Sequence, residues 1–184
     1  AVALGFNFVE SGLAWGVSAV LMVVAVIAYA SAAGALASRL VLAFVQSAFV
    51  ALHIQLAQGQ TELHFGVFVT LALLLVYLDW KLIIFGAAAF AVHHIAFDRL
   101  QAAGLGFFCL TEANFGLIVV HAVYVVVQSA VEVVLAINMN RAARQGDELG
   151  VLVSSVNRAD GISLDVRGVV TETEGANALK ATLS

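Results

Sequence analysis

The sequence predicts an all-α membrane protein, a polytopic bundle of transmembrane helices followed by a short cytoplasmic connector. Hydrophobic residues make up 62% of the 184 residues and charged residues only 11%. The mean hydropathy is +1.03, well above the level that the core of a soluble domain requires. The chain from Arg141 onward is instead rich in charged side chains. We therefore predict a transmembrane bundle at residues 1–139 and a cytoplasmic connector at residues 140–184.

Five apolar runs are long enough to span a membrane, since about 20 helical residues cross a hydrocarbon core of about 30 Å. None of them alternates polar and apolar residues as a barrel strand does, and a continuous apolar segment in lipid must satisfy its backbone groups as a helix. The predicted spans cover roughly residues 13–37, 39–57, 62–79, 82–99 and 114–138. Residues 1–11 are apolar but too short to span. We interpret them as the end of a truncated sixth helix or as an interfacial segment.

Basic residues next to the short connections predict the orientation. Arg39, Lys81 and the pair Arg141 and Arg144 all fall on one side of the membrane, whereas only Arg99 falls on the other. Because cytoplasmic connections carry the excess of Lys and Arg, the first side is predicted to be cytoplasmic. The protein is then a multi-pass membrane protein with a cytoplasmic C-terminus.

The charge and the cysteine count exclude several classes of protein. The net charge is −4 and there is no cluster of Lys or Arg, so nucleic acid is not an expected partner. Cys109 is the only cysteine, which excludes an intrachain disulfide and the CxxCH attachment of a c-type haem.

Histidines are the main candidates for function. With the directions assigned above, each lies about 3–12 Å below the outer end of its helix, so that all of them share one layer contributed by four helices. Ionisable residues inside a membrane are functional by default, and neutral imidazole is the commonest metal ligand among side chains. We therefore predict a metal or metallocofactor site, with a hydrogen-bonded or proton-handling cluster as the alternative. The predicted ligands are His53, His64, His93, His94 and His121.

Copper is the metal that this layer favours, because a compact group of imidazoles suits copper or zinc and only copper changes valence. Zinc and a b-type haem remain alternatives, although a haem needs only two facing imidazoles. Acidic and thiol groups border the same face as second-rank candidates, and a solvated headgroup-level residue or a helix cap is the preferred interpretation of each. Cys109 is the best of them, since thiolate favours copper. The secondary candidates are Glu62, Asp98, Cys109 and Glu112.

A second polar stripe follows His121 along the last span. Tyr124, Gln128 and Glu132 succeed it at helical spacing on one face, and we expect that face to point into the bundle. It is predicted either to form interhelical hydrogen bonds or to relay protons or a signal.

Three segments together suggest a family: "LHIQLAQGQTELHFGVFVTLALLLVYLDWKLI", "AVHHIAFDRLQ" and "FCLTEANFGLIVVHAVYVVVQSAVEVVLA". Over residues 36–138 they resemble the multi-spanning membrane sensor module at the N-terminus of some bacterial methyl-accepting chemotaxis proteins. All five histidines match its motifs, and the chain departs from the family at Gln55, where the family has a further histidine. The resemblance implies a sensory input domain, a homodimer, a bacterial inner-membrane location and a downstream chemotaxis signalling domain.

Two functions follow as hypotheses. In the first, the chain is a sensory input domain whose metal responds to metal supply, oxidant or redox state and whose last helix relays the change. In the second, it is a membrane redox protein, an electron carrier or oxidoreductase that uses haem or copper. A metal transporter would need polar residues throughout the bilayer, and only the stripe on the last span offers them.

Overall fold

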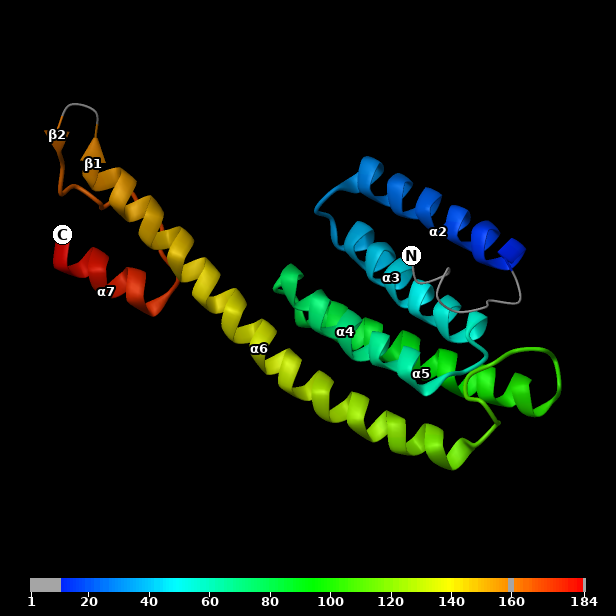
Figure 1. Cartoon of the computed structure of the whole chain (residues 1–184). Helices are drawn as coiled ribbons and strands as arrows, with labels where there is room; N and C mark the ends of the chain where they lie inside the picture. Colours follow the sequence, from blue (N-terminus) through cyan, green and yellow to red (C-terminus); the bar gives the residue numbers. More distant parts are fainter. Residues whose placement is uncertain (1–10, 159–160, 184) are drawn as a thin grey trace. The chain divides into compact units, whose positions relative to one another are not determined.

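A computed structural model describes residues 11–158 and 161–183 and shows an almost entirely helical chain (Figure 1). The described residues form six α-helices, two 3₁₀ helices and one two-stranded hairpin. Residues 1–10, which contain most of the predicted N-terminal helix end, lie outside the described residues. The elements are α2 Ser11–Ala32, α3 Leu36–Leu56, η1 Thr61–His64, α4 Phe65–Leu74, η2 Leu75–Tyr77, α5 Trp80–Ala102, α6 Phe115–Val156, β1 Asn157–Arg158, β2 Gly161–Ile162 and α7 Glu174–Leu183.

Four of these helices are long and apolar enough to cross a membrane, namely α2, α3, α5 and α6. They correspond to four of the five predicted spans and confirm the all-α prediction, and their length and composition suit the predicted multi-pass membrane protein. Their outward sides remain apolar: Trp15 on α2 is 78% exposed and Val126 on α6 is 66% exposed. Side chains of this kind are stable on a surface that lipid covers.

The remaining predicted span, residues 62–79, differs from a regular transmembrane helix. It consists of η1, α4 and η2, which follow one another over Thr61–Tyr77. The segment ends because Leu78 adopts a left-handed conformation with φ 53°, which an α-helix does not continue. Since a 3₁₀ helix rises about 2.0 Å per residue, the whole segment is about 29 Å long, close to the thickness of a hydrocarbon core. The sequence indicates the apolar run but not its tighter ends.

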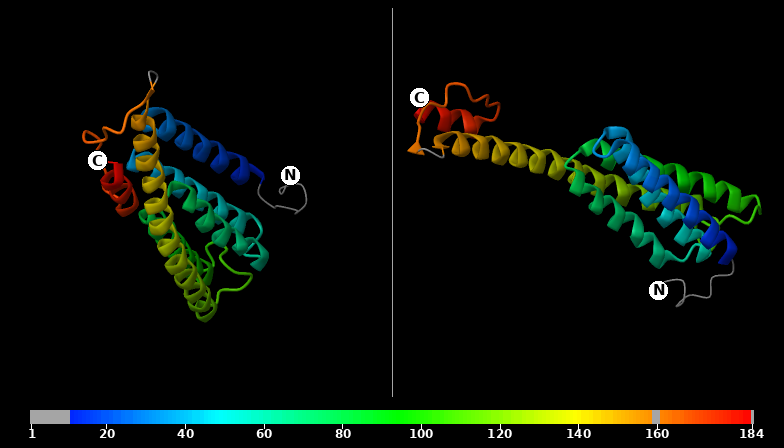
Figure 2. Two further views of the ribbon diagram at one scale, coloured as in Figure 1. Left: turned by 90° about the vertical axis from the view of Figure 1, so that its left-hand side faces the viewer. Right: turned by 90° about the horizontal axis from the view of Figure 1, so that it is seen from above.

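The chain divides into two compact units, residues 1–134 and 135–184, and α6 crosses the boundary between them. In the first unit α2 and α3 form an antiparallel pair, and α3 also packs against α4 and α5 (Figures 1 and 2). At the turn between α2 and α3, the Ser38 hydroxyl donates to the Ala28 carbonyl at 2.8 Å. The small residues around this turn allow that close approach. Large apolar side chains that are fully buried in this unit include Ile54, Leu71, Leu74, Leu82, Ile83 and Phe90.

The second unit combines the C-terminal part of α6 with the β1–β2 hairpin and α7. Its core is made by Leu152, Val166 and Ala176, all fully buried. The Glu148 carboxylate accepts hydrogen bonds from the backbone N–H of Glu172 at 3.0 Å and from both the N–H and the hydroxyl of Thr173 at 2.9 and 2.7 Å. Glu148 therefore fixes the segment that enters α7. The predicted boundary at residues 139/140 concerns the exit from the bilayer and stays a prediction.

Candidate metal centre

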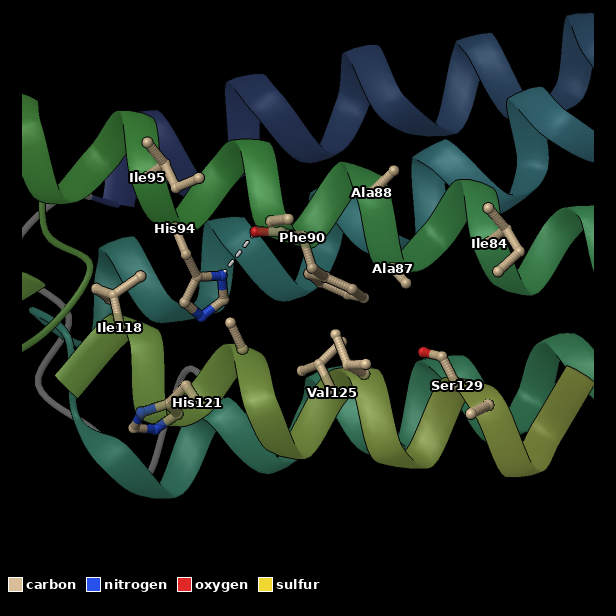
Figure 3. A pocket seen from close by; sticks show the side chains of 14 residues that line it. Ile84, Ala87, Ala88, Phe90, His94, Ile95, Ile118, His121, Val125 and Ser129 are labelled. Atoms are coloured by element: carbon tan, nitrogen blue, oxygen red, sulfur yellow. Dashed lines mark hydrogen bonds between the residues drawn. The ribbon is translucent and has the colours of Figure 1, made fainter. Parts of the chain in front are cut away.

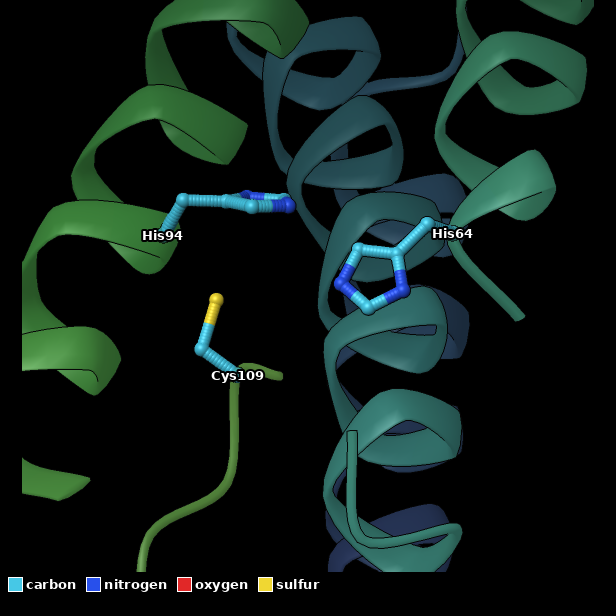
Figure 4. A group of neighbouring side chains, drawn as sticks. All are labelled: His64, His94 and Cys109. Atoms are coloured by element: carbon cyan, nitrogen blue, oxygen red, sulfur yellow. The ribbon is translucent and has the colours of Figure 1, made fainter. Parts of the chain in front are cut away.

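Three side chains from distant parts of the sequence meet at one end of the helices of the first unit. His64 ends η1, His94 lies in the C-terminal half of α5, and Cys109 lies in the loop between α5 and α6 (Figure 4). One donor atom from each lies within 4.8 Å of the donor atoms of the other two, and all three residues are buried. We call this group the His64–His94–Cys109 triad. Two imidazoles and a thiol are donors that hold a metal ion.

Backbone hydrogen bonds orient both imidazoles. His64 Nδ1 lies 3.1 Å from the Gln60 carbonyl and His94 Nδ1 lies 2.8 Å from the Phe90 carbonyl. Because a carbonyl oxygen can only accept, each Nδ1 carries the proton, and Nε2 of the neutral ring keeps its lone pair. His64 Nε2 is buried and has no hydrogen-bond partner among the described residues. Metal-ligating histidines typically donate a hydrogen bond through the ring nitrogen that does not bind the metal. The two imidazoles of the triad have this arrangement, with Nδ1 bound to a carbonyl and Nε2 left for a metal.

The spacing of the donor atoms is slightly wider than a bound ion requires. A triangle with sides of at most 4.8 Å has its centre within about 2.8 Å of each corner, whereas zinc binds nitrogen at about 2.0–2.1 Å and sulfur at about 2.3 Å. Ligation therefore requires the nitrogen donors to move inward by at most about 0.7 Å and the sulfur by at most about 0.5 Å. Movements of this size are within the range of small side-chain rotations, so the triad could hold an ion.

Two glutamine side chains fix the loop that carries Cys109. Gln101, on α5, accepts from the N–H groups of Cys109 and Leu110 at 2.9 and 3.2 Å and donates to the Leu110 carbonyl at 2.6 Å. Gln55, on α3, accepts from the Phe108 N–H at 2.8 Å and donates to the Gly106 carbonyl at 3.0 Å. The loop backbone is thus satisfied by side chains instead of by secondary structure. These contacts hold the thiol opposite the two imidazoles.

A glycine makes room for the same loop. Gly59 has φ 76°, and a Cβ at this position would collide with the backbone of Leu110. Gln58 before it is also left-handed, with φ 53°. The chain therefore turns sharply after α3 and passes directly beneath the loop, which brings η1 with His64 close to Cys109.

Burial determines the protonation state of the Cys109 thiol. The thiol is fully buried, and this burial, followed by the effect of the nearby Asp98 carboxylate, raises the pKa of Cys109 to about 12. Asp98 itself accepts from the Asn114 N–H at 2.9 Å and pairs with Arg99 at 2.7 Å. Asp98 thus serves to anchor the start of α6. At neutral pH the thiol carries its proton, which a bound ion would have to displace.

Of the other predicted ligands, two histidines lie next to the triad and the remaining residues do not belong to it. The His121 ring centroid is 5.5 Å from that of His64, and the His93 ring centroid is 5.1 Å from that of His94. The structure thus brings four of the five histidines together. His93 Nε2 is buried without a partner among the described residues, and the His93 side chain lines a neighbouring pocket together with Phe97. His53, Glu62 and Glu112 are exposed and are not part of the triad, and their predicted roles as ligands stay predictions.

The polar stripe on α6 faces the bundle only in part. Gln128 donates to the Phe68 carbonyl of α4 at 3.1 Å and to the Glu132 carboxylate at 2.6 Å, and Glu132 is buried. Tyr124, in contrast, is 65% exposed, so its predicted inward orientation is wrong. The buried side of this part of α6 is marked by Ser129, and at about 100° per residue Tyr124 lies about 140° away around the helix.

Sequence reasoning did not identify Gln101, and it noted Gln55 only as a departure from a motif. The available signal was that both glutamines stand near the ends of apolar helices that border an irregular loop. A half-buried amide at such a place needs hydrogen-bond partners, and the loop backbone supplies them.

Comparisons of the chain with models of protein families, with curated proteins and with solved structures found no match. The function is therefore argued below from the triad and from the helices that carry it.

Proposed function

We propose that this chain is a membrane-embedded sensory input module in which the His64–His94–Cys109 triad binds a metal ion, with copper as the first choice. The observation that supports the proposal is the buried triad itself, because its His64 Nε2 lone pair lacks a partner among the described residues. Burying a polar atom without a partner costs free energy, and a metal ion would offset that cost. The resemblance of residues 36–138 to chemoreceptor sensor modules supplies the biological role in this proposal.

The donor set favours copper over the alternatives. Two imidazoles with one thiolate make a soft, three-coordinate set that suits copper, and zinc is the second choice since it accepts the same donors. A haem would instead need two imidazoles on opposite sides of a large planar group. Copper also changes valence, which lets one site respond to metal supply and to oxidant.

The path of the signal follows from the elements that the donors occupy. Ligation draws His64, His94 and the Cys109 loop together, and this loop leads directly into α6, whose first residue is Phe115. Helix α6 is continuous over 42 residues, about 63 Å at 1.5 Å per residue, and so extends well beyond one membrane thickness. A metal that binds two arrangements of the loop with a tenfold difference in affinity would bias α6 by about 1.4 kcal/mol.

The orientation in the membrane completes the proposal. In it the triad faces the periplasm of a bacterial inner membrane, and the second unit lies in the cytoplasm at the head of a chemotaxis signalling domain. The ion pair between Arg39 and Asp79, at 3.4 Å, joins the two connections that are predicted to be cytoplasmic. We propose a homodimer, as the resemblance implies.

A chimera with a chemoreceptor signalling domain tests this function. Receptor output is measured with copper supplied and with copper removed by a chelator. The proposal predicts that chelation changes the output, that His64→Ala and Cys109→Ser abolish this change, and that His53→Ala retains it. Gln128→Leu should alter the response while the metal content stays the same.

An output that ignores chelation, although metal is shown to bind, would contradict the sensor proposal. That result would favour the alternative function, a copper-containing membrane electron carrier or oxidoreductase.

A further inference from the structure

A second feature lies beside the triad: a cavity of about 460 Å³ between α5 and the first turns of α6 (Figure 3). Its walls are almost entirely apolar, with Ile84, Ala91, Ile118 and Val125 among the lining residues. This volume falls within the range of about 300–1,000 Å³ that small-molecule sites occupy, and such sites combine apolar walls with a few polar groups. The cavity is therefore suited to a largely apolar ligand that reaches it from the bilayer.

Its three polar side chains are placed at opposite ends. His94 and His121 lie at one end and Ser129 lies at the other (Figure 3). Ser129 is only 5% exposed, and its hydroxyl has no hydrogen-bond partner among the described residues. A buried hydroxyl without a partner is costly, so a ligand in this cavity gains by supplying one.

The two histidines at one end of the cavity determine which polar group a ligand must present there. His121 Nδ1 lies 2.9 Å from the Leu117 carbonyl, and because that oxygen only accepts, Nδ1 carries the proton. Nε2 of the neutral ring then offers a lone pair, which can accept but not donate. A ligand that bonds here must present an O–H or N–H group and not a carbonyl oxygen.

The distance between the two ends of the cavity determines the length of the ligand. His121 and Ser129 are eight residues apart on one helix, which corresponds to about 12 Å along its axis. A six-membered ring that carries hydroxyl groups at opposite positions spans about 11 Å between the two hydrogen-bond partners of those hydroxyls. The two lengths agree within the reach of the side chains.

We propose that this cavity binds a neutral molecule of the 1,4-hydroquinone type that is dissolved in the bilayer. One hydroxyl donates to His121 Nε2, the ring packs against the apolar walls, and the second hydroxyl forms a hydrogen bond with Ser129. The proposal goes beyond metal sensing. Neither His121 nor Ser129 belongs to the triad, so the site can be tested in protein from which metal has been removed.

Binding of a decyl-substituted 1,4-hydroquinone to the full chain in lipid nanodiscs tests the proposal. The hydroquinone is kept reduced, its affinity is measured by ligand-observed NMR, and the corresponding 1,4-benzoquinone is measured in parallel. Ala122→Phe fills the cavity from its α6 side, and Ala91→Phe does so from α5. Ala72→Phe is the matched control, because Ala72 is an exposed alanine of α4 that does not line the cavity.

We expect Ser129→Ala to weaken binding of the hydroquinone by about three- to tenfold, the usual effect of losing one hydrogen bond. Each cavity-filling variant should weaken it by more, and the control should bind as the unchanged chain does. The benzoquinone should bind more weakly than the hydroquinone. Equal affinity in the cavity-filling variants and the control would overturn the site, and a benzoquinone that binds as tightly as the hydroquinone would overturn the assigned polarity. Metal content, measured separately, reports on the triad alone.

Discussion

Replacing Gln101 by leucine tests how the protein positions its only cysteine. Leucine has a similar size but removes all three hydrogen bonds that Gln101 forms with the backbone of Cys109 and Leu110. Each such bond contributes about 0.5–1.5 kcal/mol net, so the closed form of the loop should lose about 1.5–4.5 kcal/mol. The fraction of molecules with an open loop then rises by about 10- to 2,000-fold.

The rate of thiol alkylation measures that opening directly. Cys109 is fully buried and is the only cysteine, so a maleimide reagent labels it only when the loop opens. We expect Gln101→Leu to accelerate labelling by a factor in the range given above and to weaken metal binding in parallel. Gln46→Leu is the matched control, because Gln46 is an exposed glutamine of α3 away from the loop. A labelling rate for Gln101→Leu within about twofold of the control would refute the reasoning, since even one lost bond of typical strength exceeds that factor.

Three further predictions concern pH and two local contacts. The pKa of Cys109 is raised to about 12, so each bound ion should displace the thiol proton. The apparent metal affinity should therefore rise by about tenfold per pH unit between about pH 7 and 9. A potentiometric titration that finds no proton released on metal binding would contradict this. Gly59→Ala should lower metal affinity by about tenfold or more, since its Cβ would collide with the Leu110 backbone and a φ of 76° is unfavourable for alanine. Gly16→Ala, which meets nothing within 4 Å, should leave the affinity unchanged. Hydrogen bonds from the Thr173 backbone and then its hydroxyl lower the pKa of Glu148 below its ordinary 4.5. The start of α7 should therefore be protected from amide hydrogen exchange above that pH and lose this protection as the pH falls below it. Amide exchange at Thr173 measures the protection, and Glu148→Gln should remove its pH dependence.

The helices and the histidine cluster are readable from the sequence because both depend on local properties. Long apolar runs specify spans, and helix direction then sets the depth of each histidine, which is why His64, His93, His94 and His121 could be placed near one another in advance. The predicted third span shows the limit of this reasoning. Hydropathy detects its apolar residues but not the left-handed Leu78 that ends it.

The support of the triad depends on contacts between distant residues and could not be read in this way. Gln55 meets the loop across 51 and 53 positions of sequence, and no periodic pattern reports such a contact. The close approach of Gly59 to the Leu110 backbone is likewise a contact between residues far apart in the sequence, which no periodic pattern reports. Tyr124 was assigned to the wrong side because its spacing agrees with the polar stripe, whereas the true buried side of α6 is centred further around the helix at Ser129.

Metal analysis of the purified chain in nanodiscs, together with its optical spectrum, tests the central claim most directly. We predict one copper ion per chain, a thiolate-to-copper absorption in the oxidised form, and no haem Soret band. His64→Ala, His94→Ala and Cys109→Ser should each lose the ion, while His53→Ala should retain it. A chain that binds no transition metal, or one whose metal survives all three triad substitutions, would contradict the account.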